Sequence, residues 1–475
     1  MALRQLLDHS AHATRLAAAL IQAAPADVAV TCNVTAALSA IVACECRRIR
    51  LLANNSVIMY TDLGYGSVKL MIADSAAPSV ICAIPFPPPS PAAILAAITS
   101  CIQSQALAGA PVATIVIDHI TSNSALLMPV ASVARLAALH SITVVVDAAH
   151  ALGAINVAVP ALGVHYWVSN CHKWLCAPKG SGVLWVAPSH QQRLRPVVVS
   201  HAHHHGLSSA FVWDGCRDYG SLLALPAVIA QWRVLNRSGA CDVYRCSLLD
   251  AAVSLCAREW NSAWSTPPEL RGPMALVELP QRVCDRFTAA GAGVDANAAA
   301  TVQNALHRSF NVEAPIKCLH GRLFVRLSAH IYNTLQHYRS VADAVSCYAA
   351  QGEAKACDQT SSSDSIAPPP ALVSRAAGGA AAEDRVNEAA DSKRQKKDHQ
   401  EQAAACAAPQ YFRTSQLTPH TSHLTPHASH LTPHTSQLAS MSHPLAVAVA
   451  EGKVRASEVM WRHSTFVGGL TWCLH

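Results

Sequence analysis

The chain has 475 residues, of which 51% are hydrophobic and 13% are charged, so it can form a large domain, a smaller one and a tail. A net charge of +6 is modest for this length and argues against nucleic acid as the main partner. The 17 cysteines form no CxxC pair, and no secretory leader is recognised, which disfavours a disulfide framework or a zinc site and favours a reducing compartment. No apolar run is long enough to span a bilayer, so we expect no membrane partner.

The first 140 residues contain several segments with helix or strand patterns. Apolar residues at helical spacing predict a helix over residues 11–24. Further strands are expected at 27–30, 57–60 and 113–117, and further helices from about Ala36 and over 94–102 and 131–139. The sequence TCNVTAA, residues 31–37, predicts a strand, a tight turn and a helix N-terminus, which is a ready phosphate site. The alternative is that Thr35 is a simple N-cap.

The most informative segment is residues 142–186, ITVVVDAAHALGAINVAVPALGVHYWVSNCHKWLCAPKGSGVLWV. The β-branched run 142–146 predicts a buried strand of a parallel sheet, and Asp147 stands at its carboxyl end, where open α/β sheets place their ligands. A short helix-like segment follows. A second apolar stretch, 164–168, then leads into SNCHKW, and a third, 182–186, follows the turn PKGS.

An acid at a strand end, with a lysine among small donors in the next loop, suits the chemistry of pyridoxal 5′-phosphate (PLP). The lysine bonds to the cofactor's aldehyde, and the carboxylate pairs with the protonated ring nitrogen. The lysine must be neutral to attack, which desolvation or nearby cations favour. We therefore predict Lys173, Asp147 and His150 as catalytic residues, with Asn170 and His172 as donors to the phosphate. Taken singly, each residue is better explained as an ordinary buried or surface group.

The sequences DAAHALG and SNCHKWLCAPKGSG resemble the class V aminotransferase group of fold-type I PLP-dependent enzymes. Within it, the chain is most similar to the branch of isopenicillin N epimerase-like proteins, L-cysteine desulfhydrases and hercynylcysteine sulfoxide lyases, from about Leu7 to about Ala349. The resemblance implies an α/β fold. A large PLP-binding domain, residues 1–236, would hold a mostly parallel central sheet flanked by helices, and residues 237–350 would form a smaller α+β domain. It also implies a homodimer with shared active sites.

The resemblance implies further contacts with the cofactor. In the family an Asn-x-Thr turn holds the phosphate, which points to Thr35 and to the amides of Val34 and Ala36. Tyr65 would lie over the ring of the cofactor, although a surface turn with one half-buried Tyr explains it as well.

The stretch DHITS, residues 118–122, followed by PV, resembles the family's DHITSPT and PV. The resemblance places Thr121 and Ser122 near the oxygen edge of the cofactor. A structural role is favoured for His119, with acid/base chemistry as the alternative.

Two further motifs point to the substrate. FVWDGCRD, residues 211–218, resembles the family's WTGTRD, a loop that reaches the partner's active site, and Cys216 replaces its Thr with a weaker donor. Arg217 is either structural or meets the substrate. VRLSAHIYNT resembles the family's VRISAQIYNT, whose arginine binds the substrate carboxylate, so Arg326 is predicted to form a bidentate fork rather than a surface salt bridge. Its apolar neighbours in the strand should point the opposite way, leaving Arg326 to face the cleft.

Other cysteines and histidines are interpreted as structural. Cysteine desulfurases of the same fold use a loop cysteine as a nucleophile, but Cys318 approaches a strand, which argues against that activity. Four histidines among residues 200–206 predict a His-rich loop rather than a metal site, because sequence neighbours cannot converge on one ion.

Beyond Gln351 the composition changes to Ser, Ala, Pro and charged residues, which predicts a disordered tail over 351–475. Seven-residue repeats at 415–435 contain prolines that exclude a coiled coil. The basic cluster KRQKK, residues 393–397, is interpreted as solvated charge rather than an import signal.

Two hypotheses follow for the function. The favoured one is a PLP-dependent C–S lyase of the cysteine desulfhydrase kind that acts on an L-amino acid, with epimerisation or amino transfer as alternatives. The second is a degenerate, non-catalytic homologue. It is suggested by Cys216, by a shortened helix after Tyr65 and by the few residues before the first helix, where the family usually has several dozen. We expect a cytoplasmic protein, with organelles and the nucleus left open.

Overall fold

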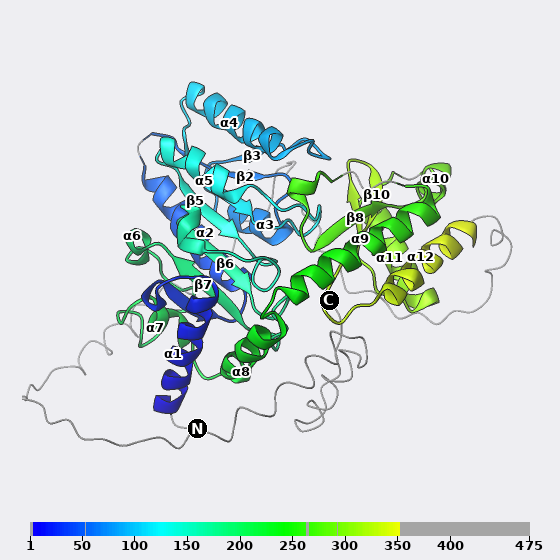
Figure 1. The fold of residues 1–475 in the computed structure, drawn as a ribbon. Helices are drawn as coiled ribbons and strands as arrows, with labels where there is room; N and C mark the ends of the chain where they lie inside the picture. Colours follow the sequence, from blue (N-terminus) through cyan, green and yellow to red (C-terminus); the bar gives the residue numbers. More distant parts are fainter. Residues whose placement is uncertain (1–2, 53, 263–265, 292, 352–475) are drawn as a thin grey trace, which may run out of the picture. The chain divides into compact units, whose positions relative to one another are not determined.

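The computed structural model describes residues 3–52, 54–262, 266–291 and 293–351. Its larger sheet has seven strands in the order β1-β7-β6-β5-β4-β2-β3 (Figure 1). Strands β2 to β6 run parallel, and β7 is antiparallel to its neighbours β1 and β6. The strands are β1 (Val28–Thr31), β2 (Val57–Thr61), β3 (Ser79–Cys82), β4 (Val112–Asp118), β5 (Thr143–Asp147), β6 (Tyr166–Asn170) and β7 (Gly182–Val186).

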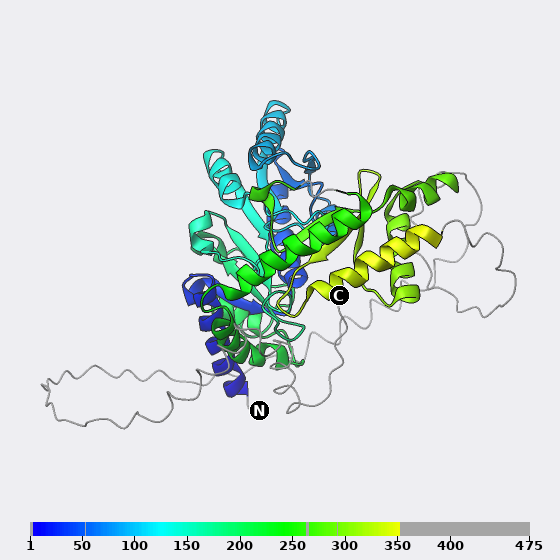
Figure 2. The ribbon, with the colours of Figure 1, turned by 45° about the vertical axis from the view of Figure 1, so that its right-hand side comes forward.

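Helices cover both faces of this sheet (Figures 1 and 2). One face packs against α1 (Leu3–Leu20), α4 (Pro91–Leu107), α5 (Val130–Leu139) and α8 (Gly220–Leu235). The other face packs against α2 (Val34–Leu51), α3 (Gly66–Asp74) and α7 (Leu207–Val212). Every residue of β5, β6 and β7 is buried, which explains why these strands are nearly continuous apolar runs rather than alternating ones.

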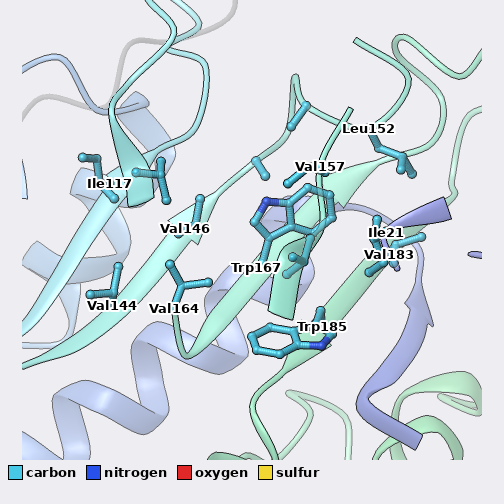
Figure 3. Close-up of a cluster of buried hydrophobic side chains, with 14 of the residues drawn as sticks. Ile21, Ile117, Val144, Val146, Leu152, Val157, Val164, Trp167, Val183 and Trp185 are labelled. Carbon is cyan, nitrogen blue, oxygen red and sulfur yellow. The ribbon is translucent and has the colours of Figure 1, made fainter. Parts of the chain in front are cut away.

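The core of the first face is built around Trp167 of β6, which is fully buried between side chains of β5 and β7 (Figure 3). The indole Nε1 of Trp167 donates a hydrogen bond to Nδ1 of His119 at 3.2 Å. Burial lowers the pKa of His119 to about 4, so this ring is neutral and serves the core. The structural role favoured for His119 fits this arrangement.

A second, three-stranded antiparallel sheet has the order β8-β10-β9. Its strands are β8 (Met274–Glu278), β9 (Ile316–Leu319) and β10 (Arg322–Ser328), and its helices are α9 (Ala240–Trp260), α10 (Gln281–Ala289), α11 (Ala296–Phe310) and α12 (Leu335–Ala350). Val325 and Leu327 pack toward these helices, whereas Phe324 packs with Ile120 and Trp174 from loops of the larger sheet. Residues that share the side of Phe324 on β10 therefore face the larger sheet.

Most predicted elements are present within a few residues of their expected bounds. The helix-like segment after Asp147 is instead a series of turns with one 3-10 helix, η2 (Val159–Leu162). Gly153 has φ +79°, and a Cβ there would lie 2.8 Å from the backbone nitrogen of Leu175, so the chain must turn there. Strand β3 and helices α9, α10 and α12 were not anticipated, whereas α3 is short, as predicted.

The remaining short elements are α6 (Pro188–Gln191) and two 3-10 helices, η1 (Pro25–Asp27) and η3 (Pro268–Leu270). The predicted domain boundary at 236–237 lies in the turn between α8 and α9. The predicted tail with its repeats and basic cluster lies outside the described residues. In the described part of the chain, no helix combines the length and the hydropathy that a membrane crossing needs.

A buried carboxylate ties α2 to the sheet. The side chain of Glu45 is fully buried, and its Oε2 accepts hydrogen bonds from Arg48 Nε and Thr114 Oγ1, both at 2.9 Å. Its Oε1 accepts from the hydroxyl of Tyr166 at 3.0 Å and lies 2.9 Å from Arg193 Nη2. Helix α2, strands β4 and β6 and the segment after α6 therefore share one ionic centre.

Replacing Glu45 with Ala should destabilise the fold by about 3 kcal/mol, because two arginines and two hydroxyls lose their common acceptor. Urea unfolding followed by circular dichroism measures the change. Glu269→Ala, at an exposed position, is the control and should change stability by less than about 0.5 kcal/mol. Equal effects of the two substitutions would contradict a structural role for the Glu45 centre.

Candidate active site

Three polar side chains stand at the carboxyl ends of adjacent parallel strands: Asp118 on β4, Asp147 on β5 and Asn170 on β6. Asp118 and Asp147 are register partners, so their side chains point to the same face of the sheet. All three are buried, with 6%, 4% and 6% of their surface exposed. Two carboxyl groups therefore lie side by side where an open α/β sheet places its ligand.

The loop between β6 and β7 brings Lys173 to this edge. Its Nζ lies 3.0 Å from Nε2 of His150, which follows β5. Nδ1 of the same ring accepts a hydrogen bond from the indole Nε1 of Trp174 at 3.1 Å. The three residues predicted as catalytic, Lys173, Asp147 and His150, are thus gathered at one end of the sheet, as the sequence suggested.

Burial sets the charges of this group. It lowers the pKa of Lys173 to about 8, aided by Arg326 and opposed by the carboxylates of Asp147 and Asp118. Burial raises the pKa of Asp147. It also raises the pKa of Asp118, and the neighbouring Asp147 raises the Asp118 pKa further. It lowers the pKa of His150, which is therefore neutral. A substantial share of Lys173 is the free amine in mildly alkaline solution, the form that acts as a nucleophile or a base.

Arg326 of β10 reaches this group from the smaller sheet. Its Nη1 donates to the carbonyl oxygen of Ser122 at 2.7 Å and to the Ser122 hydroxyl at 3.1 Å. Its Nε is buried and has no hydrogen-bond partner among the described residues. The side chain points away from Val325 and Leu327, the direction expected from strand alternation. A partly buried guanidinium with an unpaired N–H is a receptor for an anion.

The N-terminus of α2 differs from the expectation. Asn33 is the N-cap residue, and its side chain accepts from the Ala36 amide at 2.8 Å. The Val34 amide donates to Oδ1 of Asn170 at 3.0 Å. Two amides predicted to meet the phosphate are therefore engaged with side chains, whereas the Thr35 side chain is exposed. Asn170 can offer only its Nδ2 as a donor, because its oxygen holds the helix.

His172 is also partly engaged. Its Nδ1 lies 2.8 Å from the carbonyl oxygen of Ser181, which requires a hydrogen on Nδ1. Burial lowers the pKa of this ring. In the neutral ring Nε2 is then an acceptor, so His172 donates to an anion from Nε2 only when it is protonated.

Other predicted residues lie farther from this arrangement or are held by other contacts. Cys216 is exposed, and Arg217 forms an ion pair with Asp214 and lies over the ring of Tyr219 at 4.2 Å. Tyr65 is the N-cap of α3, is 45% exposed and interacts electrostatically with Arg326.

Thr121 is buried, and its hydroxyl accepts from the Leu126 amide, so it organises its own loop. Cys318 lies on β9 and donates to the Val294 carbonyl at 3.3 Å, in agreement with its structural interpretation. Across the described ranges, no three His, Cys, Asp or Glu side chains gather as a metal site would require.

The sequence reasoning did not assign roles to three residues of this arrangement. Asp118 could have been found, because it ends a predicted strand as Asp147 does. His330 carried a signal too, since it replaces the Gln of the family motif, and its ring stacks on Trp174 with centroids 5.3 Å apart. Trp174 carried none, because an indole next to a lysine is unremarkable until the fold brings His150 against it.

The seven-stranded sheet with one antiparallel strand and helices on both faces is the fold of the fold-type I enzymes, and Lys173 follows β6 in it. The solved apo structure of a cysteine desulfurase from Thermococcus onnurineus NA1 has this fold, with a TM-score of 0.54 over 73% of this chain and 85% of that chain, at 16% identity. Residues 4–207 match the family model of aminotransferase class-V. Over these residues the chain is similar to that family, in agreement with the resemblance found in the sequence.

The chain is also similar in sequence to L-cysteine desulfhydrases and isopenicillin N epimerases. The chain is 29% identical over 283 residues to an L-cysteine desulfhydrase from Arabidopsis thaliana, which covers 55% of this chain and 60% of that protein. It is 30% identical over 246 residues to an isopenicillin N epimerase from Streptomyces clavuligerus, covering 48% of this chain and 58% of that protein. The chain thus spans less than two thirds of the length of these relatives.

We predict that chemical labelling of Lys173 in the protein without added cofactor has its midpoint near pH 8, because burial disfavours the ammonium form. Trace acetylation with acetic anhydride, quantified peptide by peptide by mass spectrometry, measures this midpoint. A short unstructured lysine peptide is the reference, with a pKa of about 10.4. A Lys173 midpoint equal to that of the peptide would contradict the buried environment.

Proposed function

We propose that the protein is a PLP-dependent enzyme that acts on an L-amino acid, as a C–S lyase of the cysteine desulfhydrase kind. The partly buried amine of Lys173, with its lowered pKa and with the carboxyl group of Asp147 acting on it, carries this proposal. Similarity to an L-cysteine desulfhydrase supports the substrate class.

The residues present fit PLP. The carboxyl group of Asp147 is buried, and burial disfavours its ionised form. A cationic ring nitrogen would therefore be a favourable partner for it. Lys173 would hold the aldehyde, and the exposed Thr35 at the start of α2, with His172 in its protonated form, would meet the phosphate. Tyr65 and Ser122 would border the cofactor. When bound, PLP supplies an electron sink for the negative charge that develops at the substrate's α-carbon.

Arg326 would bind the substrate carboxylate. Its Nη1 is committed to Ser122, which fixes the plane of the guanidinium. The opposite edge, formed by Nε and Nη2, remains for a carboxylate to bind in the bidentate manner, and Nε lacks any other partner among the described residues. Such a bond would orient the substrate's α-carbon relative to Lys173, whose charge already responds to Arg326.

Lys173 would then move the proton. As a free amine it can accept the substrate's α-proton, and the His150 ring at 3.0 Å orients it. Trp174 is 4% exposed and shields the other side of His150 from water. Loss of the α-proton and of the β-thiolate, followed by hydrolysis, converts L-cysteine and water into sulfide, pyruvate and ammonia.

Epimerisation is the alternative that a specific observation favours, because the chain also resembles an isopenicillin N epimerase. It would use the same lysine and carboxylate, and only the fate of the deprotonated substrate differs. Desulfurase chemistry is disfavoured, because burial raises the pKa of the Cys318 thiol, which lies on β9 and donates to the Val294 carbonyl. A degenerate homologue is the remaining possibility.

We further propose a homodimer, with the exposed Cys216 and its neighbour Arg217 directed to the partner's site, as the family resemblance implies. A small-molecule substrate accounts for the site without nucleic acid or a membrane. We propose a cytoplasmic location for the enzyme.

The purified protein with added PLP should show a visible absorbance band that is fixed by borohydride, and Lys173→Ala should lack both properties. Absorbance spectra and the mass of the borohydride-treated Lys173 peptide measure this. Lys179→Ala, in the same loop but exposed, is the matched control and should keep the band. A protein that stays colourless with PLP would favour the degenerate homologue.

Replacing Arg326 with Gln should raise KM for L-cysteine roughly 100-fold, because two charge-assisted hydrogen bonds to the carboxylate are lost. Pyruvate release measures the effect. Arg322→Gln, on the same strand but paired with Glu278, is the control and should leave KM unchanged. Equal effects of the two substitutions would contradict a role for Arg326 in binding the substrate.

Racemisation of the substrate without release of pyruvate would instead support the epimerase alternative.

A further inference from the structure

The hydrogen bonds around His150 determine where its proton lies. An indole N–H can only donate, so the 3.1 Å bond from Trp174 requires a lone pair on Nδ1 of His150. The neutral ring must then carry its hydrogen on Nε2. That nitrogen lies 3.0 Å from Nζ of Lys173, so the lysine has to be the acceptor in this contact. Only the free amine has a lone pair with which to accept.

We propose that Trp174 is a positioning residue: its indole N–H selects the His150 tautomer whose Nε2–H points at Lys173, and thereby holds the lysine as a free amine. When Trp174 is present, protonating Lys173 removes the hydrogen bond from His150 Nε2–H to Nζ. It also leaves an N–H of the lysine facing the N–H of His150. Without the indole donor, His150 can change to the Nδ1–H tautomer and accept from a lysine ammonium. The consequence for catalysis rests on the proposed function, whereas the tautomer itself does not.

Trp174 is itself held by the second sheet. His330, which follows β10, stacks on its ring with an interplanar angle of 6°, and Nε2 of His330 lies 3.6 Å from Sγ of Cys176 in the loop that carries Trp174. The guanidinium of Arg245 in α9 lies 5.9 Å from the centre of the Trp174 ring and donates to the carbonyl of Gly153. The ring of Trp174 therefore packs between Arg245 of α9 and His330 in the loop after β10. These contacts from outside the larger sheet fix the direction of its N–H.

Other charged groups act on the same lysine and on its neighbours. Asp147 from β5 and Asp118 from β4 favour the ammonium form of Lys173, and Arg326 from β10 opposes it. Lys69 from α3 acts on Asp118, and Arg245 acts on His330. Burial lowers the pKa of His172, which is next to Lys173 in the chain. Trp174 is uncharged, so it can act on Lys173 through the hydrogen bonds of His150 and by excluding water. A phenyl ring at position 174 still excludes water but removes the hydrogen bond to His150.

The labelling midpoint of Lys173 tests the proposal on the full chain without cofactor. Trp174→Phe keeps a ring of similar shape but removes the N–H, and it should raise the midpoint by about one pH unit. Trp232→Phe is the matched control, because Trp232 is also buried and also lies against Arg245, at 5.5 Å, and it should not change the midpoint. An unchanged midpoint in folded Trp174→Phe would overturn the proposal, as would an equal shift in the control.

A double substitution separates the tautomer from a packing effect. In a His150→Leu background no ring tautomer exists and no acceptor faces the lysine, so adding Trp174→Phe should not raise the midpoint further. A further rise of similar size in that background would overturn the proposal. If Trp174→Phe does not fold by circular dichroism, His150→Leu alone decides. It removes the Nε2–H donor that favours the free amine and should raise the midpoint, and no rise would count against the proposal.

These outcomes are distinct from failure of the proposed function. Because no cofactor is added, the midpoints can be measured even in a protein that binds no PLP. If the protein is colourless with PLP and Trp174→Phe shifts the midpoint, the tautomer proposal stands and the proposed enzymatic function fails. If the protein is coloured and the midpoint does not shift, the proposed function stands and the tautomer proposal fails.

Discussion

The structure depends on charge that is removed from water at the carboxyl ends of β4 and β5. Asp118 and Asp147 lie there as register partners, and Lys173 and Arg326 are brought against them from a loop and from a second sheet. In a low-dielectric setting a lone buried charge is costly, so burial favours the uncharged forms of Asp118, Asp147 and Lys173. The second sheet is part of the site because it supplies Arg326.

The scaffold around these charges is fixed by contacts that need small residues and a few long-range bonds. A Cβ on Gly182 would lie 3.0 Å from the Ser169 carbonyl and 3.4 Å from Cα of Asn33, so a side chain there would require the backbone between β7 and the turn before α2 to move apart. Asn170 holds the first turn of α2, and Glu45 holds the same helix farther along. Helix α2 is thus fixed at its N-terminus, where an anion would bind, and again in its body.

Much of this was accessible from the sequence, for identifiable reasons. Asp147 could be placed because a continuous β-branched run ends at it, and Arg326 because strand alternation separates it from Val325 and Leu327. The bond between Asn170 and the Val34 amide joins residues 136 positions apart, and no local pattern predicts such a contact. The engagement of the α2 amides and the role of Trp174 were missed for that reason. Strand β3 was missed because it is a short, largely exposed edge strand with little apolar signal.

The bond from Arg326 to Ser122 joins parts of the site that are synthesised at different times. On a ribosome, Asp118, Asp147 and Lys173 emerge first, and Arg326 follows roughly 150 residues after the lysine, in a chain that folds from its N-terminal end. Until then the larger sheet has its two acids and one base without the guanidinium, and Trp174 lacks the ring of His330. The larger sheet therefore lacks a guanidinium beside its two carboxyl groups until β10 has been synthesised.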